Sequence, residues 1–343
     1  MTQAHDNNQE KGVKFANYAI AFIDILGQKD VLLQFNLIPN LNDQEKQKKF
    51  KAVAKNSYGV VEGLMDCCQK YLSAFSRPSS THLSQISDDK KQAYHELGKV
   101  NLKFQRFSDG LVVYTSLDGE TTRSAMNDIY GLIGVCGCMC LISLAAGHPI
   151  RGGIDIGWGA ERDENDLYGG VLAKVSVLEK KVAQYPRIVV GDEIIHYLTD
   201  KQANLTPDYF ALYNRSLAAI CPLLLAKDDD GCIIVDYLGQ GFKSMIGAKL
   251  PKDVILKAYT YIQTQQAENK YKNTAEKRKR FARYLKLRNY FESRLSIWEI
   301  TPSSRPHTIF PTTMDSLRSF CREIFSRFRK LFYVLPVHQD NHP

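Results

Sequence analysis

The pattern of apolar and polar residues predicts strands and helices that alternate along the 343-residue chain. Residues 14–26 predict a buried strand that stops at Gly27, because residues 18–26 form an almost unbroken apolar run. Residues 42–75 repeat apolar side chains at helical spacing and predict a long amphipathic helix. We expect the polar residues 76–97 to form a mobile loop.

A hairpin and a second helix are predicted next. Residues 103–117 contain two β-rich runs on either side of Ser108-Asp109-Gly110, and Asp-Gly is a strong hairpin signal. Residues 120–146 predict a helix with a small, cysteine-rich face that ends near Gly147.

The remaining expected elements are strands over 150–159, 187–191 and 231–239, a helix over 170–183, helical structure from 251, and an amphipathic helix over 314–332. The order of strand, helix, hairpin, helix, strand, helix and strand predicts an α+β fold in which helices cover a mixed sheet.

Composition adds limits on class and compartment. Hydrophobic residues make up 44% of the chain, and no window approaches 18 uninterrupted apolar residues, so we expect no transmembrane segment. Residues 1–12 are polar, without a signal-peptide core; we expect them to be disordered and the protein to be cytoplasmic. Eight cysteines lie mostly in apolar segments, and Cys136, Cys138 and Cys140 favour helix packing over a metal site.

The net charge of +8 points to an anionic partner. Residues 272–291 hold a dense basic stretch interleaved with apolar residues at helical spacing. A solvated charged face over an apolar seam is the favoured interpretation, and binding of nucleic acid or another acidic surface is the alternative. The 314–332 helix could pack on a dimer, bind a partner or lie on an acidic membrane.

Two carboxylates stand out against this pattern. Asp24 interrupts an apolar strand, where a charge is costly unless it is paired or coordinates a metal. Asp109 lies at the expected hairpin tip, and alone it is most simply a turn residue. If the strands are neighbours, the two carboxylates converge and could hold two divalent cations, Mg²⁺ or Mn²⁺, for displacement at phosphorus.

Arg151 is the third candidate, in the strand Ile-Arg-Gly-Gly-Ile. Glycines in a strand allow close approach of a ligand or another backbone, and a guanidinium suits a triphosphate oxygen. The alternatives are an ion pair with Asp155 or an edge-strand charge.

The segments FIDILG, FSDGLVVY and IRGGIDIG, followed by LYGGVLAKVSVLEKKVAQYPRIVVGDEII, resemble the class III nucleotidyl cyclase domain in order and spacing. In detail they resemble most the pyrimidine (uridylate and cytidylate) cyclases of bacterial Pycsar antiphage systems. The resemblance covers roughly residues 14–240 and implies a ferredoxin-like core. We expect a cyclase domain at 13–245, a basic helical extension at 250–300 and a tail with an amphipathic helix at 301–343.

The resemblance also implies roles. Asp24, Asp109 and the Ile25 carbonyl would be the metal ligands, and Arg151 would reach the phosphates. Ala21, Lys174 and Arg106 are the further candidates for nucleotide contact.

One helix departs from the purine cyclases. Counted from Leu178-Glu179, their ribose-orienting Asn, transition-state Arg and base-selecting Asp become Ala173, Val177 and Gly170. A purine cyclase is therefore disfavoured, and other groups must stabilise the pentavalent phosphate unless the protein is catalytically weak.

The implied function is conversion of UTP or CTP to the 3′,5′-cyclic monophosphate and pyrophosphate by a homodimer with sites at its interface. The product would be a second messenger that switches on a separate effector protein in antiphage defence. The alternatives are a catalytically weak cyclase-like module that binds nucleotide or a partner, and a nucleic-acid-binding protein. The cyclase interpretation itself carries no nucleic-acid partner.

Overall fold

A computed structural model describes residues 12–35, 37–75, 99–107, 110–118, 125–163, 166–206, 209–246, 250–270 and 274–301. The chain forms two compact units that interleave along the sequence. The first comprises Met1–Asp24, Pro78–Cys136 and Arg151–Val235, and the second comprises Ile25–Arg77, Gly137–Ile150 and Asp236–Pro343. The linear domain boundaries expected from the sequence remain a prediction.

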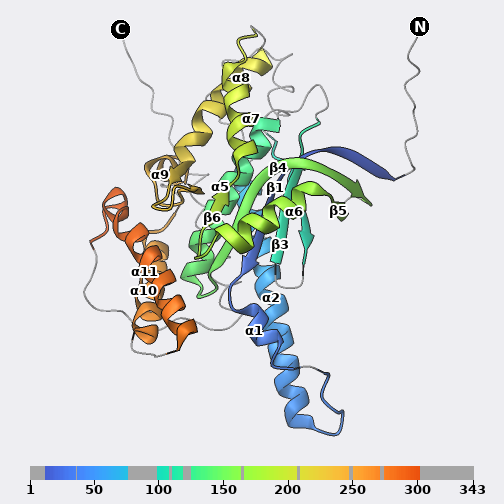
Figure 1. The fold of residues 1–343 in the computed structure, drawn as a ribbon, viewed down its shortest axis with the longest axis vertical. Coiled ribbons are helices and arrows are strands. Elements are labelled where there is room, and N and C mark those ends of the chain that lie inside the picture. Colours follow the sequence, from blue (N-terminus) through green and yellow to red (C-terminus); the bar gives the residue numbers. More distant parts are fainter. Residues whose placement is uncertain are drawn as a thin grey trace. The chain divides into compact units, whose positions relative to one another are not determined.

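The protein is α+β, with helices covering a mixed sheet of eight strands in the described residues. The strands are β1 (Val13–Ile25), β2 (Lys103–Arg106), β3 (Gly110–Ser116), β4 (Ile150–Arg162), β5 (Asp166–Tyr168), β6 (Ile188–Val190), β7 (Leu225–Lys227) and β8 (Ile233–Val235). Their order is β2-β3-β1-β4-β6-β8-β7, and β5 pairs with β4. Strands β1, β3, β4, β5 and β6 of this sheet are labelled in Figure 1. The pairs β1–β3 and β2–β3 are antiparallel, whereas β4 and β6 are parallel.

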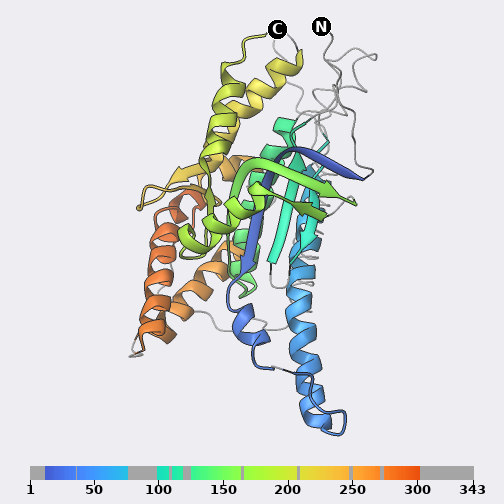
Figure 2. The ribbon, with the colours of Figure 1, turned by 45° about the vertical axis from the view of Figure 1, so that its right-hand side comes forward.

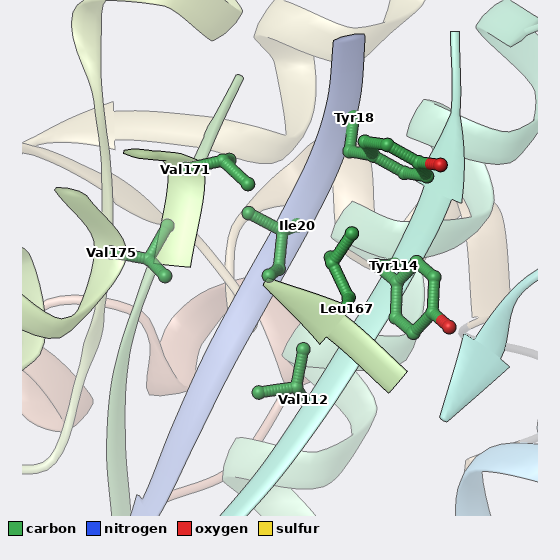
Figure 3. Close-up of a cluster of buried hydrophobic side chains, with 7 residues drawn as sticks. All are labelled: Tyr18, Ile20, Val112, Tyr114, Leu167, Val171 and Val175. Carbon is green, nitrogen blue, oxygen red and sulfur yellow. The ribbon is translucent and has the colours of Figure 1, made fainter. Parts of the chain in front are cut away.

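One buried hydrophobic cluster of the first unit lies between the sheet and helix α6 (Gly170–Val177). Tyr18 and Ile20 of β1 alternate with residues on the other face, as do Val112 and Tyr114 of β3. These side chains pack with Val171 and Val175 of α6 and with Leu167 of β5, and all seven are buried (Figure 3). The period-two pattern of β1 and β3 therefore directs one sheet face toward α6.

Two glycines let neighbouring strands approach β1 closely. A Cβ at Gly152 of β4 would lie 2.4 Å from the Phe22 carbonyl oxygen. A Cβ at Gly110 of β3 would lie 2.8 Å from the Ile23 carbonyl oxygen. The close approach that Gly152 of the Ile-Arg-Gly-Gly-Ile strand allows is therefore an approach to the β1 backbone.

Helix α6 continues into a π-helical turn, η1 (Leu178–Val182), so the predicted helix over 170–183 is confirmed. The pair α7 (Asp192–Ala203) and α8 (Tyr209–Ile220) follows, then a short 3₁₀ turn, η2 (Cys221–Leu224). The expected strand over 231–239 is wrong in length. Only Ile233–Val235 pair, because a turn at Asp228–Gly231 precedes them and α9 (Gln240–Ile246) begins soon after them.

The second unit is helical in its described residues. It holds α1 (Gln28–Leu32), α2 (Gln44–Phe75), α9, α10 (Lys252–Asn269), α11 (Ala275–Glu292) and the 3₁₀ turn η4 (Leu295–Trp298). Helices α10 and α11 lie side by side as a helical hairpin (Figures 1 and 2). The predicted helices over 42–75 and from 251 are therefore confirmed.

Helix α5 (Ala125–Ala145) carries the cysteine-rich face. Cys136, Cys138 and Cys140 are buried and free, burial raises the pKa of the Cys136 and Cys138 thiols, and the described residues contain no group of three His, Cys, Asp or Glu suited to a metal. Helix packing is the role that this geometry supports. By length and composition α5 could also cross a membrane, although 94% of its most apolar window is buried.

Other predictions fall outside the described residues. They are the disordered start of the chain, except Gly12, the loop over 76–97, and the amphipathic helix over 314–332.

Candidate active site

Asp24 is the penultimate residue of β1 and lies at the C-terminal end of this buried strand. Side chains two residues apart in a strand share a face, so Asp24 points to the same side as Tyr18 and Ile20, the side that α6 covers. Its side chain is 20% exposed, and Arg151 Nε donates a hydrogen bond to Asp24 Oδ2 at 3.3 Å. Because Arg151 compensates the negative charge of Asp24, the burial of Asp24 does not by itself require a metal ion.

Arg151, the second residue of β4, faces two carboxylates. Besides the contact with Asp24, its Nε lies 2.6 Å from Glu179 Oε1. Both sequence-based alternatives for Arg151 are wrong. Asp155 pairs instead with Lys174 at 2.9 Å, and β4 lies inside the sheet between β1 and β6.

Glu179 is a site residue that the sequence reasoning missed. It lies in η1, directly after α6, and its side chain is 2% exposed. Its Oε1 accepts no hydrogen bond from the described residues, so the contact with Arg151 is electrostatic. The available signal was a carboxylate inside the largely apolar stretch Gly170–Val182, since a buried carboxylate needs a cationic partner.

The hairpin that carries Asp109 forms as predicted. Phe107 and Gly110 exchange two backbone hydrogen bonds, at 3.0 and 3.4 Å, and β2 and β3 pair on either side. Gly110 pairs directly with Asp24 in the β1–β3 register. Asp109 itself lies outside the described residues, so its role as a metal ligand remains a prediction.

Lys174, in α6, forms an ion pair with the buried Asp155 at 2.9 Å and lies 3.7 Å from Glu193. Its side chain is 43% exposed and borders a pocket of about 810 Å³. The pocket is lined by α6, β6, the start of α7 and the turn before β8. Lys174 therefore has two carboxylate partners. The structure does not bring it together with Asp24 and Arg151 through any of these contacts.

The three other candidate residues differ in exposure. Ala21 is fully buried and pairs with Val113, so its side chain is part of the sheet interior. Ile25 is 2% exposed, and its carbonyl is the group that the resemblance assigns to a metal. Arg106 is an exposed residue that ends β2. The roles of all three remain predictions.

The chemistry of this sheet end is that of an anionic and cationic cluster. Carboxylate oxygens suit Mg²⁺ or Mn²⁺, and a guanidinium binds phosphate or carboxylate oxygens in a fixed geometry. Asp24 is partly exposed and can reach a ligand, whereas Glu179 is buried. No protein-family model matches the chain, and no curated protein matches it.

Proposed function

We propose that the protein is a metal-dependent pyrimidine nucleotidyl cyclase that converts UTP or CTP to the 3′,5′-cyclic monophosphate and pyrophosphate. One observation carries the proposal: β1 lies between β3 and β4, so that Asp24 contacts Arg151 on one side and pairs with Gly110, the neighbour of Asp109, on the other. Three of the four segments that carry the cyclase resemblance, FIDILG, FSDGLVVY and IRGGIDIG, thus contribute to neighbouring strands of the sheet.

The strand order gives further support. Helices follow β1 and β3 along the chain, and β4-β1-β3-β2 are adjacent in that order. This βαββαβ connectivity supports the ferredoxin-like core that the resemblance implies.

In the proposed site, Asp24, Asp109 and the Ile25 carbonyl would hold two divalent cations, Mn²⁺ or Mg²⁺. Such cations lower the pKa of a bound hydroxyl and neutralise triphosphate charge. The oxygen donors present at Asp24 fit these ions.

The chain's own groups orient and neutralise the substrate. Arg151, 20% exposed, can donate to a phosphate oxygen while Glu179 fixes the position of its guanidinium. Lys174 and Arg106 are proposed as further cations toward the nucleotide. In this proposal two copies form the sites at their interface, and the product acts on a separate effector protein in the cytoplasm during antiphage defence.

A specific observation favours a second candidate, a catalytically weak cyclase-like binding module. Ala173 and Val177 occupy the positions of the purine cyclases' Asn and Arg, and both side chains are exposed on one face of α6. Neither side chain can donate a hydrogen bond to a nucleotide.

The experiment incubates the full chain with each of the four nucleoside triphosphates and Mn²⁺, and identifies products by mass spectrometry. A cyclic pyrimidine monophosphate with equimolar pyrophosphate supports the cyclase. Saturable nucleotide binding without product supports the binding module.

A further inference from the structure

Helix α11 concentrates the positive charge of the chain. Its 18 residues hold seven cations against two carboxylates, in a protein whose net charge is +8. This concentration lies in the second unit, and the nucleotide chemistry proposed above makes no use of it.

The helix has a buried side and an outward side. Tyr284, Leu287, Tyr290 and Phe291 are buried and form the apolar side of the helix, whereas Leu285, another of its apolar residues, is 39% exposed. The outward side consists of exposed residues that lie along one face of the helix, namely Ala275, Arg278, Lys279, Ala282, Leu285, Lys286 and Asn289. We call these seven residues the basic face.

The two carboxylates of α11 do not neutralise the basic face. Glu276 pairs with Arg280 at 2.7 Å, and Glu292 pairs with Arg288 at 2.7 Å. In the described part of the chain, Arg278, Lys279 and Lys286 have no ion-pair partner. Three cations therefore face solvent together, with no carboxylate among them.

We propose that the basic face of α11 binds the phosphate backbone of a nucleic acid. A polyanion with regularly spaced phosphates complements cations along a helix, and release of its counterions drives binding. The small side chains of Ala275 and Ala282 let a backbone approach the helix closely. This inference is independent of the proposed cyclase function and departs from the expectation that the chain has no nucleic-acid partner.

Two other occupants fit less well. Insertion into a membrane needs several large apolar side chains on the binding face, and the basic face offers only Leu285, which is 39% exposed. The chain's own 314–332 segment carries five cations against two carboxylates, so it has the same sign of charge as the basic face. Charge complementarity thus favours a phosphate backbone.

The test is fluorescence anisotropy of a labelled 20-base-pair DNA duplex and of a single-stranded RNA, titrated with the full chain at several salt concentrations. The variant Arg278→Gln/Lys279→Gln/Lys286→Gln removes the three exposed cations. We expect it to weaken binding at least tenfold at 0.1 M salt, and to reduce the slope of log K against log[salt] on the duplex by about 3.

The matched control is Lys48→Gln/Lys49→Gln/Lys51→Gln, which removes three exposed cations from α2 and the same net charge. Circular dichroism verifies that both variants fold. The proposal holds if the control keeps wild-type affinity and slope. The proposal is overturned if the control variant loses as much affinity as the α11 variant. It is also overturned if the wild-type chain binds neither nucleic acid, or if the wild-type chain binds only vesicles containing anionic lipid.

Discussion

The ion pair between Arg151 and Glu179 gives the sharpest prediction about the site. Glu179→Gln keeps the shape of the side chain and removes its charge. At 2.6 Å and an effective dielectric constant near 20, the Coulomb attraction is about 6 kcal/mol. Desolvation of a carboxylate that is 2% exposed offsets most of this gain, so we expect the free energy of unfolding to fall by about 2 kcal/mol.

The assay is urea denaturation at pH 7 of the wild type, Glu179→Gln, Arg151→Gln and the double variant. The cycle isolates the pair, and we expect a coupling energy of about 1–2 kcal/mol. Glu193→Gln is the control, because Glu193 is 51% exposed and 3.7 Å from Lys174; its effect should stay below about 0.5 kcal/mol. A coupling energy near zero, or an equal loss in the control, would refute the assignment of Glu179 to Arg151.

Two further predictions concern the packing and the pH dependence of the first unit. Gly152→Ala places a Cβ 2.4 Å from the Phe22 carbonyl oxygen, and should lower the melting temperature much more than Gly157→Ala, whose Cβ meets its nearest neighbour at 3.3 Å; equal melting temperatures would contradict the close approach of β4 to β1. Arg187 is 2% exposed, and its hydrogen bonds hold the pKa of Asp230 well below the ordinary value of 3.8. Asp230 therefore stabilises the fold above about pH 4, and this contribution is lost as the pH falls below that value. Arg187→Met should lower the free energy of unfolding by about 3 kcal/mol at pH 7. Urea denaturation should show the difference in this free energy between variant and wild type narrowing between about pH 4 and pH 2; a difference that stays constant with pH would contradict the link to Asp230.

Local patterns predicted the strands and helices that lie around the site. The apolar run ending at Gly27 gave β1, and the Asp-Gly signal gave the β2–β3 hairpin. Both rest on residues that are close in sequence, where periodicity and turn chemistry act directly.

Partners distant in sequence could not be predicted. Arg151 was recognised as unusual, but its partners Asp24 and Glu179 come from β1 and from the turn after α6. Which carboxylates surround a guanidinium depends on strand order and on helix packing against the sheet, which no local pattern encodes. For the same reason the ion pair of Lys174 with Asp155 across the α6–β4 interface could not be predicted.

The most direct test of the central claim compares wild-type chain with Asp24→Ala in the triphosphate assay with Mn²⁺. The proposal predicts that the wild type forms a cyclic pyrimidine monophosphate and that Asp24→Ala forms none, while circular dichroism and urea denaturation verify that the variant remains folded. Undiminished product from a folded Asp24→Ala variant would contradict the role of Asp24, and with it the proposed site.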